Sequence, residues 1–301
     1  MEFSMPIRVR WDVDFRGRSE RPKRIARAIR EASPLFLELR FDGKRGVSDL
    51  PAILAEMSQG GSRIEATVRL SPETAKVVSA GYPARFRWEL DSAGRFPAVL
   101  PGGAGAVSFT PDEDSIGELP GLIEDFADSP SEELVLPNVN AVRALADRGH
   151  VPIPTPERLR RVTGEIARLS VPLNGKRIVV HDFFLWQALK SAFPGAVGER
   201  VEFSGCQAGT ALAYVDWEGN VYPCDSLPIR LGNLLDTPFE KVWKAPARER
   251  LADSIRATPG GCLECAERTG CHGGCRGLAY LADNSFDCPD PSCPQKAQGR
   301  S

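Results

Sequence analysis

The chain has 301 residues, of which 42% are hydrophobic, and its formal net charge at pH 7 is -2. A charge so close to zero gives no whole-chain argument for nucleic-acid binding, and no stretch approaches the roughly 20 apolar residues of a membrane span. The N-terminus lacks the apolar segment of an export signal, so we expect a cytoplasmic protein with no nucleic-acid or membrane partner. The length suggests two domains, or one large α/β domain with an appendage.

Residues 1–90 alternate between strand-like and helix-like patterns. Apolar side chains occupy every second position from Ile7 to Val13, which is typical of a half-buried strand. The segment 25–32 instead has helical spacing. We expect further strands at 35–39, 64–70 and 86–90, and further helices at 50–57, ended by Gly60-Gly61, and from Ser71-Pro72 onward, where Ser caps the helix and Pro suits its first turn.

Residues 107–195 continue this alternation less regularly. We expect strands near Val107, at 134–136 and at 178–180, and helices at 119–126, at 159–169 behind Thr155-Pro156, and at 182–189 capped by Asp182. Six or so such repeats predict a parallel sheet, either open and doubly wound or closed into a full or partial barrel. The run Gly102–Gly105 lacks the third glycine of a dinucleotide loop, so we interpret it as a turn.

Two segments carry charge of one sign. Residues 8–30 contain nine Arg and Lys, and residues 112–133 contain nine Asp and Glu without any Lys or Arg. Two solvated faces are the simpler interpretation. A docking surface for a charged partner is the alternative.

The cysteines are clustered, because all eight lie between residues 206 and 293. Four of them follow the pattern Cys262-x2-Cys265-x5-Cys271-x3-Cys275. Such short spacings bring several sulfurs onto one small loop, as a zinc or iron–sulfur site requires. A disulfide framework is disfavoured, because disulfides are rare in reducing cytosol and a chain of this length can bury a core without them. On spacing alone, structural zinc stays open.

This pattern resembles the SPASM domain of radical S-adenosylmethionine (radical SAM) enzymes. The family signature is a cysteine, a gap, Gly-x4-Cys, a second gap, Cys-x2-Cys-x5-Cys-x3-Cys, a third gap and a final cysteine. Its elements correspond here to Cys206, Gly219, Cys224, Cys262, Cys265, Cys271, Cys275 and Cys293. The segments 217–224 and 231–233, Val242-Trp243 and Asp290-Pro291 are also similar to the family. The resemblance favours iron–sulfur over zinc.

The resemblance implies two auxiliary [4Fe–4S] clusters. The first would be held by Cys206, Cys224 and Cys275. The second would be held by Cys262, Cys265, Cys271 and Cys293. The fourth ligand of the first cluster stays open: it is Cys288, a non-cysteine ligand, or none, which would leave an iron site open to substrate. An unliganded Cys288 is an equal alternative.

The cysteine-free front resembles the partial (β/α)6 barrel of the same enzymes in its order of elements. We therefore expect an α/β fold with a partial TIM-like barrel at 1–200 and a SPASM domain at 201–301. Radical SAM enzymes carry Cys-x3-Cys-x2-Cys after the first strand, where this chain has no cysteine, and their Gly-Gly-Glu-Pro motif is reduced to Asp42-Gly43. The chain thus resembles a degenerate radical SAM/SPASM protein, of the type paired with a complete one in GeoRSP systems.

This resemblance implies a protein without catalytic residues that neither cleaves nor needs S-adenosylmethionine and has no cofactor beyond its two clusters. Its expected role is a non-catalytic or electron-relay partner of a radical SAM enzyme that modifies peptides. A small peptide-binding protein and a peptide substrate are further expected partners. Two alternatives remain: an independent iron–sulfur enzyme that uses an open-site cluster, and a structural zinc protein.

Overall fold

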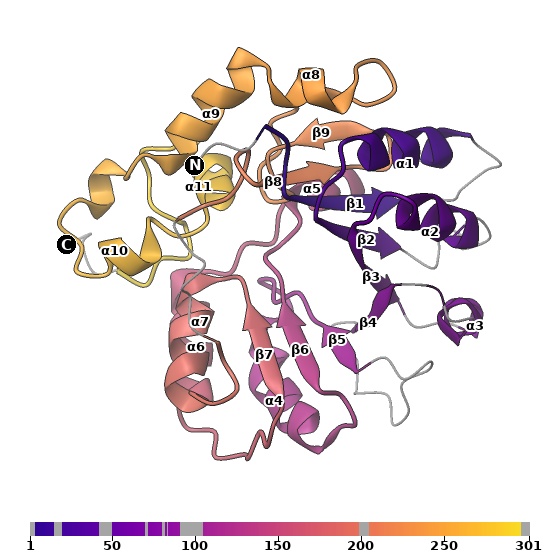
Figure 1. Cartoon of the computed structure of the whole chain (residues 1–301). Helices are drawn as coiled ribbons and strands as arrows, with labels where there is room; N and C mark the ends of the chain where they lie inside the picture. The colour runs from indigo at the N-terminus through magenta and orange to yellow at the C-terminus, as the bar shows by residue number, and fades with distance from the viewer. Residues whose placement is uncertain are drawn as a thin grey trace. The chain divides into compact units, whose positions relative to one another are not determined.

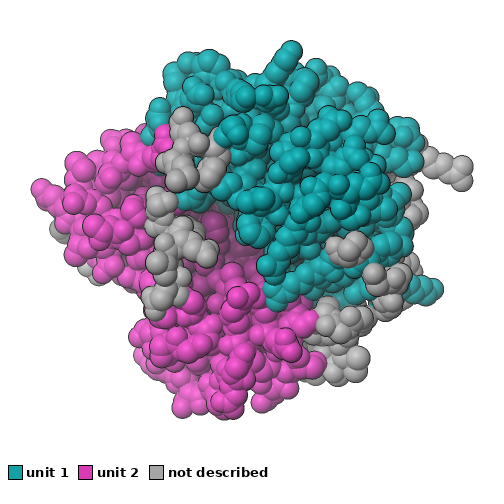
Figure 2. Space-filling model, viewed as in Figure 1, with its two compact units in different colours: residues 1–89, 101–104, 207–255 teal, residues 90–100, 105–206, 256–301 magenta. Residues whose placement is uncertain are grey.

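The computed structural model describes residues 4–14, 20–41, 50–69, 72–79, 82, 84–90, 105–198 and 205–295. The chain forms two compact units (Figure 2). Unit 1 comprises residues 1–89, 101–104 and 207–255, and unit 2 comprises residues 90–100, 105–206 and 256–301. Each unit contains part of the parallel-stranded α/β structure that the sequence predicts.

Unit 1 is built on a parallel sheet whose helices lie along it in Figure 1. Its first four strands pair in chain order: β1 (Arg8–Val13), β2 (Phe36–Phe41), β3 (Arg63–Arg69) and β4 (Arg85–Glu89). On the other side of β1, β8 (Leu212–Val215) pairs in parallel, and β9 (Asn220–Tyr222) and β10 (Gly232–Asn233) follow antiparallel. The segment after residue 206 therefore extends the sheet of the N-terminal strands.

Apolar and charged side chains alternate along these strands, so the sheet has one apolar face and one charged face. Val9, Trp11, Leu39 and Trp88 are buried on the apolar face. The helices of unit 1 are α1 (Arg21–Glu31), α2 (Leu50–Ser58), α3 (Pro72–Ser79), α8 (Phe239–Trp243) and α9 (Pro246–Arg256). Helices α1 and α2 bury the apolar positions that the helical spacing predicts, so the apolar pattern of the sequence accounts for these two helices.

Unit 2 contains three parallel strands, β5 (Ala106–Ser108), β6 (Glu133–Leu136) and β7 (Arg177–Val180). Its helices before residue 200 are η3 (Ile116–Glu118), α4 (Leu119–Asp128), α5 (Ala141–Arg148), α6 (Pro156–Ile166) and α7 (Phe183–Ala192). Its C-terminal segment adds η4 (Gly260–Cys262), α10 (Arg268–Cys271) and α11 (Arg276–Asp283). Two of the predicted caps are confirmed, because Thr155 accepts from the Arg158 N–H and Asp182 from the Leu185 N–H.

Several expectations differ from the structure or fall outside it. Strand β2 begins at Phe36, and Leu35 is 64% exposed rather than part of the strand. Helix α5 was not expected, and only Ala141 and Val142 of its residues are buried, whereas Leu145 is exposed. Ser71, Asp42-Gly43 and most of the glycine run at 102–105 lie outside the described residues. So does the domain boundary predicted at 200/201, which stays a prediction.

The two charged segments are not simply solvated faces, so that interpretation is wrong in part. Arg10 lies in the interior, with a side chain 12% exposed, because β1 turns it to the charged face of the sheet. Glu133 is buried in β6 and paired with Arg177. The acidic side chains of α4, by contrast, are exposed at Glu124, Asp125 and Asp128. Within the described part of the chain, no helix has the length and apolar character needed to span a membrane.

Candidate metal centre

Four cysteines surround one cavity in unit 2. Cys262, Cys265, Cys271 and Cys293 line a space of about 160 Å³. These are the four residues expected to hold the second cluster, so the structure brings that set together. Cys288 is not among the residues that line this cavity.

Tight turns of the backbone present these sulfurs. Cys262 closes the η4 turn, and the Cys265 N–H donates to the Cys262 carbonyl at 3.2 Å. Cys271 ends helix α10, where its N–H donates to the Glu267 carbonyl at 2.8 Å. The Cys293 N–H donates to the Asp290 carbonyl at 3.0 Å. The backbone at each of these cysteines is therefore fixed by local hydrogen bonds rather than by a long regular element.

Glycines let the chain pass close to the turn that carries Cys293. Gly273 and Gly274 have φ angles of 84° and 73°, in the left-handed region that favours glycine. A Cβ on Gly274 would lie 2.4 Å from the Cβ of Asp290. Any larger residue at position 274 would push the turn at 290–293 away, so glycine at this position keeps Cys293 beside the cavity.

The cavity has an apolar wall from helix α7. Phe183 and Phe184 line it, with their ring centroids 5.7 Å apart and their planes at 77°. Gln187 also lines it and donates to Glu267 at 2.9 Å. Burial raises the pKa of Cys271 to about 12 and, together with Cys293 and Cys265, raises the pKa of Cys262. Without a metal these thiols keep their protons at neutral pH, so a bound metal has to displace them.

The four sulfurs form an all-sulfur donor set, which both tetrahedral zinc sites and iron–sulfur clusters use. They surround a space similar to the roughly 150 Å³ that accommodates a benzene-sized guest. An all-sulfur donor set around such a space fits a compact iron–sulfur cluster.

The other expected ligands are divided between the units. Cys206 and Cys275 lie in unit 2, and Cys224 lies in unit 1. Burial raises the pKa of Cys275, and Asp290 and Cys206 raise it further. Cys275 is the N-cap of helix α11, and its N–H donates to the Asp290 carboxylate at 2.7 Å. Cys224 is buried in the turn that follows β9.

Asp290 and Arg276 are functional candidates that sequence reasoning did not single out as site residues. Asp290 is 1% exposed, and its second oxygen accepts from the Ser292 N–H at 2.8 Å. Burial, with the nearby Asp182, raises its pKa to about 7. Arg276 is also 1% exposed. Their positions next to the signature cysteines were the available signal, since buried charges beside metal ligands tune the metal.

A buried ion network covers the charged face of the unit 1 sheet. Arg10 on β1 donates to Glu38 on β2 at 2.9 Å and to Asp225 at 3.1 Å. Arg40 on β2 also binds Asp225. Arg87 on β4 lies 3.8 Å from Glu38. Charged residues at every second strand position were the sequence signal for this network.

Two opposing effects, burial and ion pairing, set the pKa values in this network. Burial alone would raise the pKa of Glu38, but Arg10, Arg40 and Arg87 lower it to about 2. Burial lowers the pKa of Arg40, but Asp225 and Glu38 raise it well above its usual value. The network is therefore ionised at neutral pH, and its charges largely satisfy one another.

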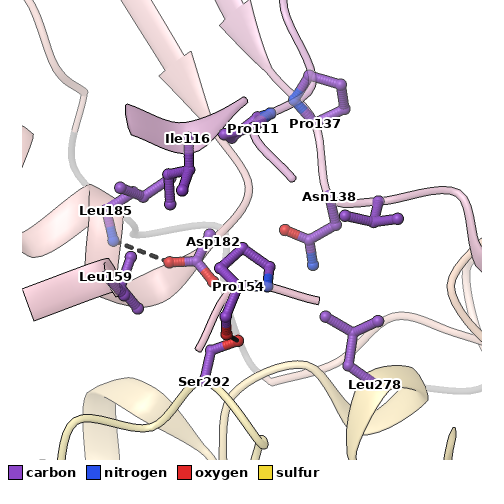
Figure 3. Close-up of a pocket in the computed structure, with 11 residues that line it drawn as sticks. Pro111, Ile116, Pro137, Asn138, Pro154, Leu159, Asp182, Leu185, Leu278 and Ser292 are labelled. Atoms are coloured by element: carbon purple, nitrogen blue, oxygen red, sulfur yellow. Dashed lines mark hydrogen bonds between the residues drawn. The ribbon is translucent and has the colours of Figure 1, made fainter. Parts of the chain in front are cut away.

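A second, much smaller cavity of about 20 Å³ lies in unit 2 (Figure 3). Its lining includes Asn138, Asp182 and Ser292. Asp182 accepts from the Leu185 N–H, and Ser292 donates to the Pro154 carbonyl at 2.8 Å. The volume corresponds to about one water molecule. This cavity is too small for a substrate, even though it lies where strands of such folds often place their chemistry.

Comparisons with known proteins agree with the cysteine pattern. Residues 206–266 match the SPASM family model, described as an iron-sulfur cluster-binding domain. An AdoMet-dependent heme synthase of Nitratidesulfovibrio vulgaris is 30% identical over 106 residues, which are 35% of this chain and 29% of that protein. The mycofactocin maturase MftC of Mycobacterium ulcerans is 32% identical over 126 residues, or 40% of this chain and 32% of that protein. The matches thus span about a third or less of these curated relatives.

Solved structures share the fold over almost the whole chain. Native anSMEcpe with bound AdoMet and a Cp18Cys peptide has a TM-score of 0.64 at 14% identity, covering 97% of this chain and 95% of that chain. Streptococcus suis SuiB bound to the precursor peptide SuiA has a TM-score of 0.60 at 15% identity, covering 97% and 76%. At such identities the likeness establishes the fold alone. The chain is a relative of radical SAM/SPASM proteins, with their α/β fold and an iron–sulfur cluster-binding SPASM domain.

Proposed function

We propose that this relative of radical SAM/SPASM proteins is a non-catalytic or electron-relay iron–sulfur partner of a radical SAM enzyme that modifies peptides. One observation carries the proposal: all eight cysteines lie between residues 206 and 293, and none precedes them. A catalytic cluster needs three thiolates on the loop after the first strand of the barrel. The segment that follows β1 here, residues 14–35, supplies none.

The charged face of the unit 1 sheet supports the same conclusion. Glu38 and Asp225 are buried there, and Arg10 and Arg40, whose side chains are 12% and 13% exposed, pair with them. Removing one member of a buried ion pair leaves an uncompensated charge, which is strongly unfavourable. We infer that this face serves to hold the strands together and does not take up S-adenosylmethionine.

The cluster assignment is part of the proposal. Cys262, Cys265, Cys271 and Cys293 would hold the second cluster at the cavity that they line. Cys206, Cys224 and Cys275 would hold the first, with Cys288 as a further candidate ligand. The boundary near residue 200 would then separate the barrel-like part from the SPASM part.

Bound clusters would supply one-electron transfer. The chain's own residues would prepare the site for it. The cysteines would hold the metal as thiolates after their protons leave, and Phe183 and Phe184 would limit the access of water from one side of the cavity. Backbone hydrogen bonds fix the turns at 262–265 and 290–293, which carry three of these cysteines.

The peptide part of the proposal rests on the structural relatives. SuiB is described in complex with its precursor peptide, and anSMEcpe with bound peptides. The exposed acidic side chains of α4 would offer this chain a surface for a charged partner. An independent iron–sulfur enzyme is the second candidate, favoured by the three-cysteine set of the first cluster, which would leave one iron open.

The test is a product assay with two arms. In the first arm, the anaerobically purified and reduced protein is incubated alone with S-adenosylmethionine, and we expect no 5′-deoxyadenosine above a protein-free control. In the second arm, the chain is coexpressed with any radical SAM enzyme that a neighbouring gene encodes, and we expect the two proteins to copurify. Formation of 5′-deoxyadenosine by this chain alone would overturn the proposal. Turnover of a small molecule by the isolated protein would favour the independent enzyme.

A further inference from the structure

Arg276 is a buried arginine in the cysteine-rich segment of unit 2. It directly follows Cys275 in the first turn of helix α11, and only 1% of its surface is exposed. Lone arginine charges are rarely buried to this extent unless they are paired. The groups around Arg276 therefore indicate the role of its charge.

Backbone carbonyls hold the guanidinium in place. Its Nη1 donates to the Cys288 carbonyl at 2.9 Å, and its Nη2 donates to the Phe286 carbonyl. The Nε–H has no hydrogen-bond partner among the described residues. The two carbonyls are neutral, so they fix the position of the guanidinium without cancelling its charge.

The guanidinium lies next to the four-cysteine cavity. A Cβ on Gly273 would be 3.1 Å from Nη1 of Arg276, so the guanidinium lies directly against this glycine. Gly273 is itself one of the residues that line the cavity. The separation between the positive charge and the cavity is therefore about the thickness of one peptide backbone.

We propose that Arg276 is an electrostatic residue that raises the reduction potential of the iron–sulfur cluster at the four-cysteine cavity. This cluster accepts one electron from a low-potential donor, which adds one negative charge to it and breaks no bond. A nearby positive charge in a poorly solvated environment stabilises that added charge. The idea rests on the proposed function, because it requires a cluster at this cavity that transfers electrons.

The experiment is a redox titration of the cluster-loaded protein with dithionite, followed by electron paramagnetic resonance. Arg276→Gln removes the charge and keeps some hydrogen-bonding capacity. Arg276→Lys keeps the charge but lacks the planar guanidinium group with its several N–H donors. Arg248→Gln is the matched control, since Arg248 is 4% exposed and donates to the carbonyls of Trp243 and Gly209. For Arg276→Gln we expect the ratio of reduced to oxidised cluster at a given potential to fall about tenfold, or about 59 mV for a one-electron couple.

The control and the lysine variant make each outcome decisive. We expect Arg248→Gln to leave the potential of the cavity cluster unchanged and Arg276→Lys to restore most of the shift. An unchanged potential in Arg276→Gln, or an equal shift in Arg276→Lys, would overturn the proposal. It also fails if neither Arg276 variant binds clusters while Arg248→Gln does, since Arg276 would then be structural. If the wild-type protein itself contains no iron, the proposed function fails instead.

Discussion

Replacing Arg40 with Met tests whether the buried ion network stabilises unit 1. The Arg40 side chain is 13% exposed, and it pairs with Asp225, which is 2% exposed, and lies 3.8 Å from Glu38. Met keeps much of the aliphatic stem but leaves two buried carboxylates with less positive charge. Removing one partner of a buried ion pair costs about 3–5 kcal/mol. Arg10 still contacts both carboxylates, so we expect the lower end, about 3 kcal/mol.

The direction in which pH changes this loss of stability follows from the pKa of Glu38. Glu38 has its pKa lowered to about 2, so its pairing stabilises the fold fully above the ordinary carboxyl range and loses this effect as the pH falls towards 2. The difference in stability between the wild type and Arg40→Met should therefore narrow as the pH is lowered from neutral into that range.

Urea unfolding of the cluster-loaded protein measures the effect. With slopes of about 1–3 kcal/mol per molar urea, a loss of about 3 kcal/mol lowers the midpoint by about 1 M or more. The control is Lys23→Ala, because Lys23 pairs with Glu20 at the surface, where such pairs are worth about 0–1 kcal/mol. The double variant with Asp225→Asn should lose less than the sum of the two single variants. If Arg40→Met is no less stable than Lys23→Ala, the network gives no net stability and the reasoning is refuted.

Two further predictions concern the cysteines and the acidic helix. Cys265→Ala should remove one cluster and destabilise the C-terminal segment. Cys288→Ser should leave the cavity cluster intact, because Cys288 does not line that cavity. Unchanged iron content in Cys265→Ala would contradict the ligand assignment. Reversing the exposed Glu124, Asp125 and Asp128 to Lys should slow association with a radical SAM partner and leave iron content unchanged. Association of the wild type should weaken with added salt, since exposed charges are screened beyond about 10 Å at 0.1 M. If association is insensitive to both the added salt and the charge reversal, the acidic face of α4 is not the docking surface.

Patterns that depend on neighbours along the chain predicted most of the fold. Alternation predicted β1, and the spacing of Ile25 and Ile29 predicted α1, because burial of one face of an element leaves a periodic trace. Helix α5 was missed because its buried positions, Ala141 and Val142, are too few to form a stripe. Its capping by Asn140 and its end at Gly149 were the available signals.

The site was predictable where spacing determines it and not where tertiary contacts do. The cysteine pattern grouped the four residues that line the cavity. The pairing of Arg10 with Asp225 joins residues that are far apart in the chain, so no local pattern predicts it. The burial of Glu133 follows from its place on β6 next to Arg177, which reverses the expectation drawn from its acidic neighbours.

Iron, acid-labile sulfide and zinc per chain, measured after anaerobic purification, test the central claim most directly. Two [4Fe–4S] clusters predict about eight iron and about eight sulfide per chain, with little zinc. A colourless protein that contains stoichiometric zinc and no sulfide would contradict the account.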